Sequence, residues 1–239
     1  MHDQTHSAAP FIQVTYRYKS HVLRLTVPQG EAFLVGDIFL REEYPLTKLK
    51  GVFGRVVVLD IGANVGLFSI YAKLNIPNAT IHCFEPSGLM RKALEINTAP
   101  FANIHLHPVA LSDHDGEQTL FLNPVKTGQS SLKPNQEPTR EPFGPTLVEE
   151  TVQVCDAGKA FDDLQLDCVD ILKVDTEGSE IEILKSLGSR LERIKHVYLE
   201  YHSQADKKEM HELLADFVLL EHFERGENVG ILKYMNSRL

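Results

Sequence analysis

The sequence is poor in cysteine and contains no long apolar run. Its three cysteines, Cys83, Cys155 and Cys168, lack the spacing of a metal site, and two of them lie inside apolar runs. They indicate free, mostly buried thiols in a reducing compartment. No apolar run approaches the ~18 residues that a membrane-spanning helix needs, and the opening segment MHDQTHSAAP has no signal-peptide pattern. We expect a cytoplasmic protein with no membrane partner.

Positive charge is also scarce. The chain has 24 Lys and Arg residues against 33 Asp and Glu residues, a net charge of -9, which works against binding a polyanion through its phosphates. We therefore expect no nucleic-acid partner. Hydrophobic residues make up 43% and charged residues 24% of the 239 residues. These shares are close to globular averages and exclude disordered, collagen-like and coiled-coil chains.

Strand-like and helix-like segments alternate along most of the chain. From Arg55 a continuous apolar run, VVVLDI, leads through glycines into the helix-like LFSIYAKLN. Further strands are expected at 80–84, 104–109, 169–174 and 196–200, with helices at 89–96, 180–187 and 207–215. This alternation predicts an α/β fold with a doubly wound, mostly parallel sheet. The tail segments FVLLEHF and VGILKYM flank the turn-rich ERGEN and predict an antiparallel pair.

Two segments fall outside this alternation. Residues 11–40 alternate between apolar and polar side chains and predict an N-terminal β-hairpin, within a hairpin and cap segment at 1–54. The strand-like TLFL and TVQV enclose a proline-rich insertion at 123–147, which we interpret as a substrate lid because long loops in compact domains often carry function. The remaining domain spans 55–239.

Ligands of open α/β sheets bind beyond the carboxyl ends of the strands, so the strand ends are the places to search. The first strand ends in Asp60 and the turn IGANVG. A dinucleotide fingerprint would need glycine at positions 62, 64 and 67, but Asn64 and Leu67 occupy two of them. Asp60 would repel a pyrophosphate, whereas it suits a cationic ligand such as S-adenosylmethionine.

The next two strand ends suit a nucleoside. Glu85 follows Asp60 by 25 residues, and an acid there can accept hydrogen bonds from both ribose hydroxyls, although the spacing alone is weak evidence. The third strand ends near Leu111 and Ser112, where apolar side chains could flank an adenine ring. An ordinary boundary between strand and turn explains that segment equally well.

Five segments, VVVLDIGANVGLFSIYA, FEPSG, ALSDHDG, LKVDTEGSEIEILKSL and YLEYH, resemble the FkbM family of S-adenosylmethionine-dependent methyltransferases between about Arg55 and His202. The resemblance implies a Rossmann-like class I methyltransferase fold, a seven-stranded sheet whose last strand is antiparallel, and O-methylation of sugars, macrolides or related metabolites. It implies cofactor contacts at Asp60, Gly62, Asn64, Gly66, Glu85, Leu111, Ser112 and Ser130. We also predict cofactor contacts at Ala63, Pro86, Ala110 and Asp175. Relatives often carry Thr-Leu-Asp where this chain has Cys155 to Lys159, so the entry to the next helix differs.

An aliphatic hydroxyl has a pKa of roughly 15, so its methylation needs a base or a metal ion. The ends of the fourth and fifth strands bring Asp175, Glu177, Glu200 and His202 around one small volume. His202 could act as general base, or Asp175, Glu200 or His202 could hold a divalent cation. Alternatively, the two glutamates cap loops or pair with Lys173 while the cofactor ammonium engages Asp175. We consider Asp175 and His202 functional.

The sequence therefore predicts an S-adenosylmethionine-dependent O-methyltransferase whose partner is a small hydroxylated metabolite or glycoside. Two alternatives are a nicotinamide-dependent oxidoreductase and a catalytically idle scaffold that keeps the cofactor pocket. His105 and His107 share a strand face without a third ligand in sequence reach, so we interpret them as packing residues rather than a metal site.

Overall fold

The computed structural model describes residues 11–46, 54–123, 128, 130–133 and 147–239. Its strands are β1 (Phe11–Tyr18), β2 (His21–Pro28), β3 (Val56–Ile61), β4 (Ala79–Phe84), β5 (Ile104–His107), β6 (Ala110–Ser112), β7 (Gly116–Leu122), β8 (Val148–Asp156), β9 (Val169–Val174), β10 (Ile194–Tyr201), β11 (Phe217–Glu224) and β12 (Gly230–Asn236). Its helices are η1 (Gln29–Glu31), α1 (Leu34–Phe39), α2 (Leu67–Asn75), α3 (Gly88–Thr98), α4 (Ala157–Asp163), α5 (Glu180–Leu187), η4 (Gly188–Arg193) and α6 (Gln204–Leu213).

The central sheet has seven strands in the order β11-β12-β10-β9-β3-β4-β5. β3 pairs in parallel with both β4 and β9, and β9 pairs in parallel with β10. Only β12 runs against its neighbours, β10 and β11. The doubly wound, mostly parallel sheet with an antiparallel last strand is therefore confirmed.

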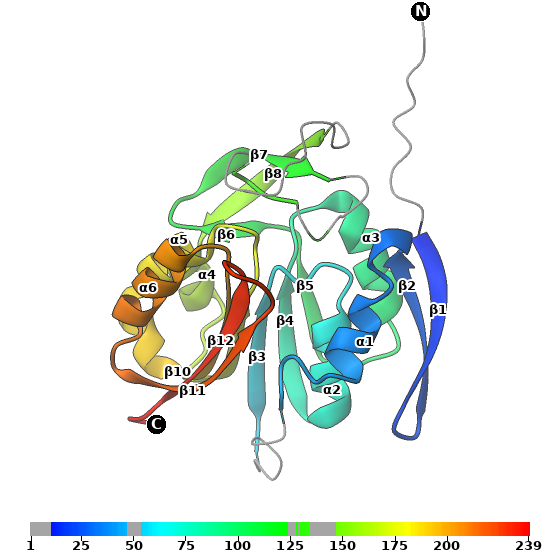
Figure 1. Ribbon diagram of the computed structural model, residues 1–239, viewed down its shortest axis with the longest axis horizontal. Helices are drawn as coiled ribbons and strands as arrows, with labels where there is room; N and C mark the ends of the chain where they lie inside the picture. Colours follow the sequence, from blue (N-terminus) through cyan, green and yellow to red (C-terminus); the bar gives the residue numbers. More distant parts are fainter. Residues whose placement is uncertain (1–10, 47–53, 124–127, 129, 134–146) are drawn as a thin grey trace, which may run out of the picture.

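Helices cover both faces of this sheet, with α2 and α3 on one side and α4, α5 and α6 on the other (Figure 1). Every residue of β3 is buried. Val56 and Val58 join the apolar cluster under α2 and α3, whereas Val57, Leu59 and Ile61 join the cluster under α4 and α5. Because strand side chains alternate between faces, a strand buried on both sides is mostly apolar, and in β3 the exception is Asp60.

The N-terminal hairpin packs against the α2 and α3 side of the domain (Figure 1). The Asn97 side chain of α3 exchanges two hydrogen bonds with the Thr26 backbone of β2, at 2.7 and 2.9 Å. The sequence predicts a β-hairpin over residues 11–40. In the structure the hairpin ends at Pro28, and η1 and α1 follow it. Val35, Ile38 and Phe39 are buried on one side of α1, so packing against α2 determines the helix.

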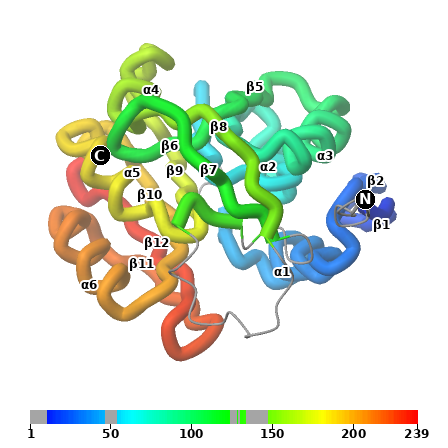
Figure 2. The backbone as a smooth tube through the Cα atoms, turned by 90° about the horizontal axis from the view of Figure 1, so that it is seen from above, coloured from blue at the N-terminus to red at the C-terminus, as the bar shows by residue number. Residues whose placement is uncertain are grey.

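A second, three-stranded sheet with the order β6-β8-β7 lies over the end of the central sheet at which β3 and β4 finish (Figures 1 and 2). The third parallel strand ends earlier than predicted, at His107, because Ala110–Ser112 leaves it to pair with β8. The expected strands TLFL and TVQV form parts of β7 and β8. Most of the predicted lid at 123–147 lies outside the described residues, so its role stays a prediction.

Candidate active site

The turn after β3 forms the floor of the site. Gly62 and Gly66 adopt positive φ angles of 75° and 84°, which residues other than glycine rarely adopt. The backbone N–H groups of Gly62 and Ala63 both donate to the Phe84 carbonyl at 3.0 Å. A Cβ atom at Gly62 would lie 1.9 Å from the backbone oxygen of Asp175, so glycine lets the ends of β3 and β9 approach.

A cavity of about 680 Å³ opens at the carboxyl ends of β3, β4, β9 and β10, a size typical of small-ligand sites. Its wall is completed by the N-terminal segment before and within α1, by the turn between β11 and β12, and by Gly128, Ser130, Leu132 and Lys133. Twelve of the predicted site residues line it: Gly62, Ala63, Asn64, Glu85, Pro86, Ala110, Leu111, Ser130, Asp175, Glu177, Glu200 and His202.

Asp60 does not face this cavity. Its side chain is fully buried, 3.2 Å from the ammonium of Lys173, and accepts a hydrogen bond from Ser69 at 2.6 Å. Lys173 in turn donates to the Gly62 carbonyl at 2.8 Å. The negative charge of Asp60 is thus neutralised inside the protein, and the residue shapes the glycine turn instead of meeting a cationic ligand.

Gly66 and Ser112 also lie behind the cavity wall. A Cβ atom at Gly66 would meet the Leu94 side chain of α3 at 2.6 Å, so this glycine serves the packing of α2 on α3. Ser112 is buried in β6, where it pairs with β8, and its hydroxyl lies 3.4 Å from the Asp113 carboxylate. The family resemblance implies cofactor contacts at both residues, but neither lines the cavity.

Glu85 is held in place by two backbone N–H groups. Its carboxylate oxygens accept hydrogen bonds from Asn64 at 2.8 Å and from Ser87 at 2.9 Å. Burial raises the pKa of Glu85 to about 7, although these two donors and Lys173 lower it. Each oxygen retains a lone pair for a ligand hydroxyl. With Phe84, Leu111 and other apolar side chains lining the adjoining wall, this end of the cavity fits a nucleoside.

Asp175, at the end of β9, lies between two donors from distant parts of the chain. The Tyr44 hydroxyl donates to its carboxylate at 3.0 Å, and the Lys173 ammonium lies 3.6 Å away. Burial alone would raise the pKa of Asp175, but Lys173 and the hydrogen bond with Glu200 hold it below its usual range. Tyr44 is a site residue that the sequence does not reveal, because it belongs to no motif.

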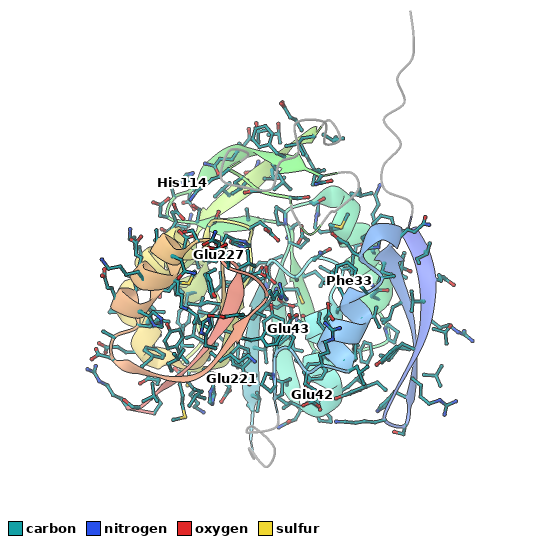
Figure 3. All side chains as sticks on the ribbon, in the orientation of Figure 1. Phe33, Glu42, Glu43, His114, Glu221 and Glu227 are labelled. Atoms are coloured by element: carbon teal, nitrogen blue, oxygen red, sulfur yellow. The ribbon has the colours of Figure 1, made fainter. Side chains whose placement is uncertain are left out.

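Glu200, at the end of β10, is buried beside Asp175 and Arg225. Burial and then the charge of Asp175 raise the pKa of Glu200 well above its usual range, and the Arg225 guanidinium lowers it. Arg225 pairs with Glu200 and also with Glu43, at 2.5 Å. Figure 3 shows Glu43 between α1 and the β11–β12 hairpin. Arg225 is the second site residue without a sequence signal.

His202 lies between two carboxylates. Its Nδ1 is 3.7 Å from Glu177 Oε2, and its Nε2 is 3.7 Å from Glu200 Oε2. Among the described residues, Nε2 is a buried atom without a hydrogen-bond partner. The structure thus brings together Asp175, Glu177, Glu200 and His202, the four residues that the ends of strands four and five place in one volume.

The segment 130–133 contacts the loop that follows β9. The Ser131 hydroxyl donates to the Glu177 carbonyl at 2.5 Å, and the Lys133 ammonium donates to the Gly178 carbonyl at 2.8 Å. Ser130 lines the cavity. The described part of the insertion therefore borders the carboxylate and imidazole cluster.

His105 and His107 lie away from this cluster. Both rings stack on His82 of β4, and the ring centroids of His82 and His105 are 5.0 Å apart. His107 also stacks on Phe84, with ring centroids 4.5 Å apart. These contacts agree with a packing role. No helix among the described residues has the length and apolar character to span a bilayer.

The sequence of the chain is similar to one protein family and to several known proteins. A family model described as "Methyltransferase FkbM domain" matches residues 60–229. The chain is 28% identical over 193 residues to methyltransferase sdnD of Sordaria araneosa, covering 70% of this chain and 73% of sdnD. It is 28% identical over 200 residues to 31-O-demethyl-FK506 methyltransferase FkbM of Streptomyces tacrolimicus, covering 74% and 76% of the two chains.

A third relative is far longer. The chain is 26% identical over 180 residues to the AMB antimetabolite synthetase AmbE of Pseudomonas aeruginosa, covering 63% of this chain but only 8% of AmbE.

Proposed function

Because the chain belongs to the FkbM methyltransferase family and is an S-adenosylmethionine-dependent methyltransferase, we propose that it methylates a hydroxyl group of a small metabolite or glycoside. One observation carries the proposal: a carboxylate and imidazole cluster lies in the same cavity as a nucleoside-sized niche around Glu85. The nicotinamide-dependent alternative is set aside, because the family transfers methyl groups.

The cofactor end of the site is formed by the glycine turn and by Glu85. The Glu85 carboxylate would accept the ribose hydroxyls, and Leu111 with Ala110 would border the adenine. Asp175, whose low pKa keeps it ionised, would face the cofactor's positive charge. When bound, S-adenosylmethionine supplies a methyl carbon whose bond to sulfur breaks as the acceptor oxygen binds it, leaving S-adenosylhomocysteine.

The acceptor end of the site is the cluster of Glu177, Glu200 and His202. A hydroxyl becomes a nucleophile there when its proton is taken by the His202 imidazole, or when its pKa is lowered by a cation that these side chains hold. Both routes need the imidazole at this position. The name of the Streptomyces relative refers to an O-demethyl compound, which supports oxygen as the methyl acceptor.

The proposal is tested first by ligand binding. Isothermal titration of the full chain should give one site for S-adenosylhomocysteine and one for S-adenosylmethionine, and NAD should give no heat of binding. Incubation with methyl-labelled S-adenosylmethionine and a panel of hydroxylated glycosides should then transfer label to an alkali-stable ether. Cofactor binding without label transfer to any hydroxyl, or transfer only to nitrogen or carbon acceptors, would refute O-methylation.

A further inference from the structure

We propose that Glu177, Glu200 and His202 form a binding site for one divalent transition-metal cation, Mn²⁺ or Zn²⁺ in type, at the acceptor end of the cavity. The residues come from the loop after β9 and from the end of β10. One ligand atom from each lies within 4.8 Å of the other two. All three residues line the cavity, so a bound cation would be open to a further ligand.

The separations between these groups support a cation rather than direct hydrogen bonds. The Nε2 atom of His202 lies 3.7 Å from Glu200 Oε2, which is too far for a hydrogen bond, and a single ligand atom from each of the three residues lies within 4.8 Å of the other two. Two ligands that each lie about 2.1 Å from a tetrahedral ion are separated by roughly 3.4 Å. A small displacement of the side chains would therefore complete the coordination.

The second observation is the state of the imidazole. The Nε2 atom of His202 is buried and accepts or donates no hydrogen bond within the described part of the chain. A buried polar atom without a partner is costly, and it faces Glu200 Oε2 at 3.7 Å and Glu180 Oε1 at 3.9 Å. Glu180 is already occupied by Thr176 and Gly178, which leaves Glu200 as the partner ligand.

The charges around the cluster favour a cation as well. Asp175, Glu177 and Glu200 gather here with Lys173 and Arg225 as the neighbouring cations. Glu200 is buried and pairs with Arg225 through Oε1, whereas its Oε2 lies 3.7 Å from His202 Nε2. Buried carboxylates are normally paired or bound to a metal.

The ligand set indicates the class of metal. One imidazole with two carboxylates suits Mn²⁺, Fe²⁺ or Zn²⁺, whereas Mg²⁺ and Ca²⁺ prefer oxygen ligands throughout. The role of the cation rests on the proposed function: the cation would lower the pKa of an acceptor hydroxyl bound to it, so that the hydroxyl gives up its proton more easily than a free hydroxyl does. Binding of the cation itself does not depend on that function.

Mn²⁺ provides the test, because the electron paramagnetic resonance signal of free Mn²⁺ falls when the ion binds. Chelator-treated protein of these 239 residues in 0.15 M salt should bind one Mn²⁺ per chain, and Zn²⁺ should displace it. Glu177→Gln and His202→Ala should each weaken binding by about tenfold or more, since each removes a ligand. Glu149→Gln and His114→Ala, which change exposed groups outside the cavity, should bind as the unchanged protein does.

Titration with S-adenosylhomocysteine on the same samples shows that each variant is folded. The metal proposal is overturned if cofactor binding is intact but Mn²⁺ and Zn²⁺ do not bind, or if they bind equally well to Glu177→Gln and His202→Ala. Such a result would leave the methyltransferase proposal standing. Loss of cofactor binding in the unchanged protein would instead count against the proposed function.

Discussion

At the scale of single residues, the ionisation of Glu85 should control cofactor affinity. Its pKa lies at about 7 because the carboxyl is buried, and the ionised form is the better acceptor for ribose hydroxyls. The dissociation constant for S-adenosylhomocysteine should therefore fall by about tenfold between pH 6 and pH 8, as the ionised fraction rises. Calorimetry across this range measures the effect.

Glu85→Gln is the control, since its amide does not titrate. The variant should bind more weakly at pH 8 and show a flatter pH profile than the unchanged protein. Parallel profiles for the two proteins would mean that another group is responsible.

His202 should act on the transfer step and not on cofactor binding. With an acceptor identified by label transfer, His202→Ala should lower kcat by about 100-fold or more, while the dissociation constant for S-adenosylhomocysteine changes little. His114→Ala, an exposed histidine, should leave both values unaltered. An unchanged kcat in His202→Ala would remove the imidazole from the mechanism.

Residues at the ends of parallel strands can be located from sequence, because such ends meet at one edge of the sheet. This is why Asp175 and His202 are found together. Their orientation cannot be read in the same way: Asp60 is the next-to-last residue of β3, but its side chain is buried against Lys173. Tyr44 and Arg225 escape prediction altogether, because they reach the site from a linker and a hairpin turn without any local pattern.

At the scale of secondary structure elements, the start of α4 depends on Asp156. One carboxylate oxygen caps the helix by accepting from the Lys159 N–H at 2.8 Å, and the other accepts from the Ser186 hydroxyl of α5 at 2.7 Å. Asp156→Ala should lower the free energy of unfolding by about 1–2 kcal/mol. Urea unfolding followed by circular dichroism measures it. Asp163→Ala, at the exposed far end of α4, should cost less, and equal losses would contradict the cap.

Elements with a strong periodic pattern are the ones that the sequence predicts well. β9 and α5 occupy the predicted residues 169–174 and 180–187, because a strand buried on both faces and a short amphipathic helix have distinct patterns. The prediction is wrong for the end of the third strand, where pairing with β8 takes over Ala110–Ser112. Tertiary packing decides such boundaries, and no local pattern reveals it.

At the scale of the whole molecule, Arg225 joins three regions that are distant in sequence: the N-terminal segment through Glu43, the end of β10 through Glu200, and its own β11–β12 turn. Arg225→Met would leave two buried carboxylates without their cation. We expect a loss of about 2–3 kcal/mol in the free energy of unfolding. This is below the roughly 3–5 kcal/mol of a fully buried pair, because the Arg225 side chain is 30% exposed.

The loss should depend on pH in a defined direction. Burial and Asp175 already raise the pKa of Glu200, and Arg225 lowers it. Removing the Arg225 charge in Arg225→Met should therefore raise the pKa of Glu200 further. A carboxyl whose pKa is higher in the folded than in the unfolded state destabilises the fold as pH rises through that window. Urea unfolding should therefore show a larger difference from the unchanged protein at pH 8 than at pH 5. Arg238→Met, which removes an exposed pair with Asp216, should change the free energy of unfolding little at either pH. If Arg225→Met loses the same free energy of unfolding at pH 5 and pH 8, lost packing and not unpaired charge is the cause.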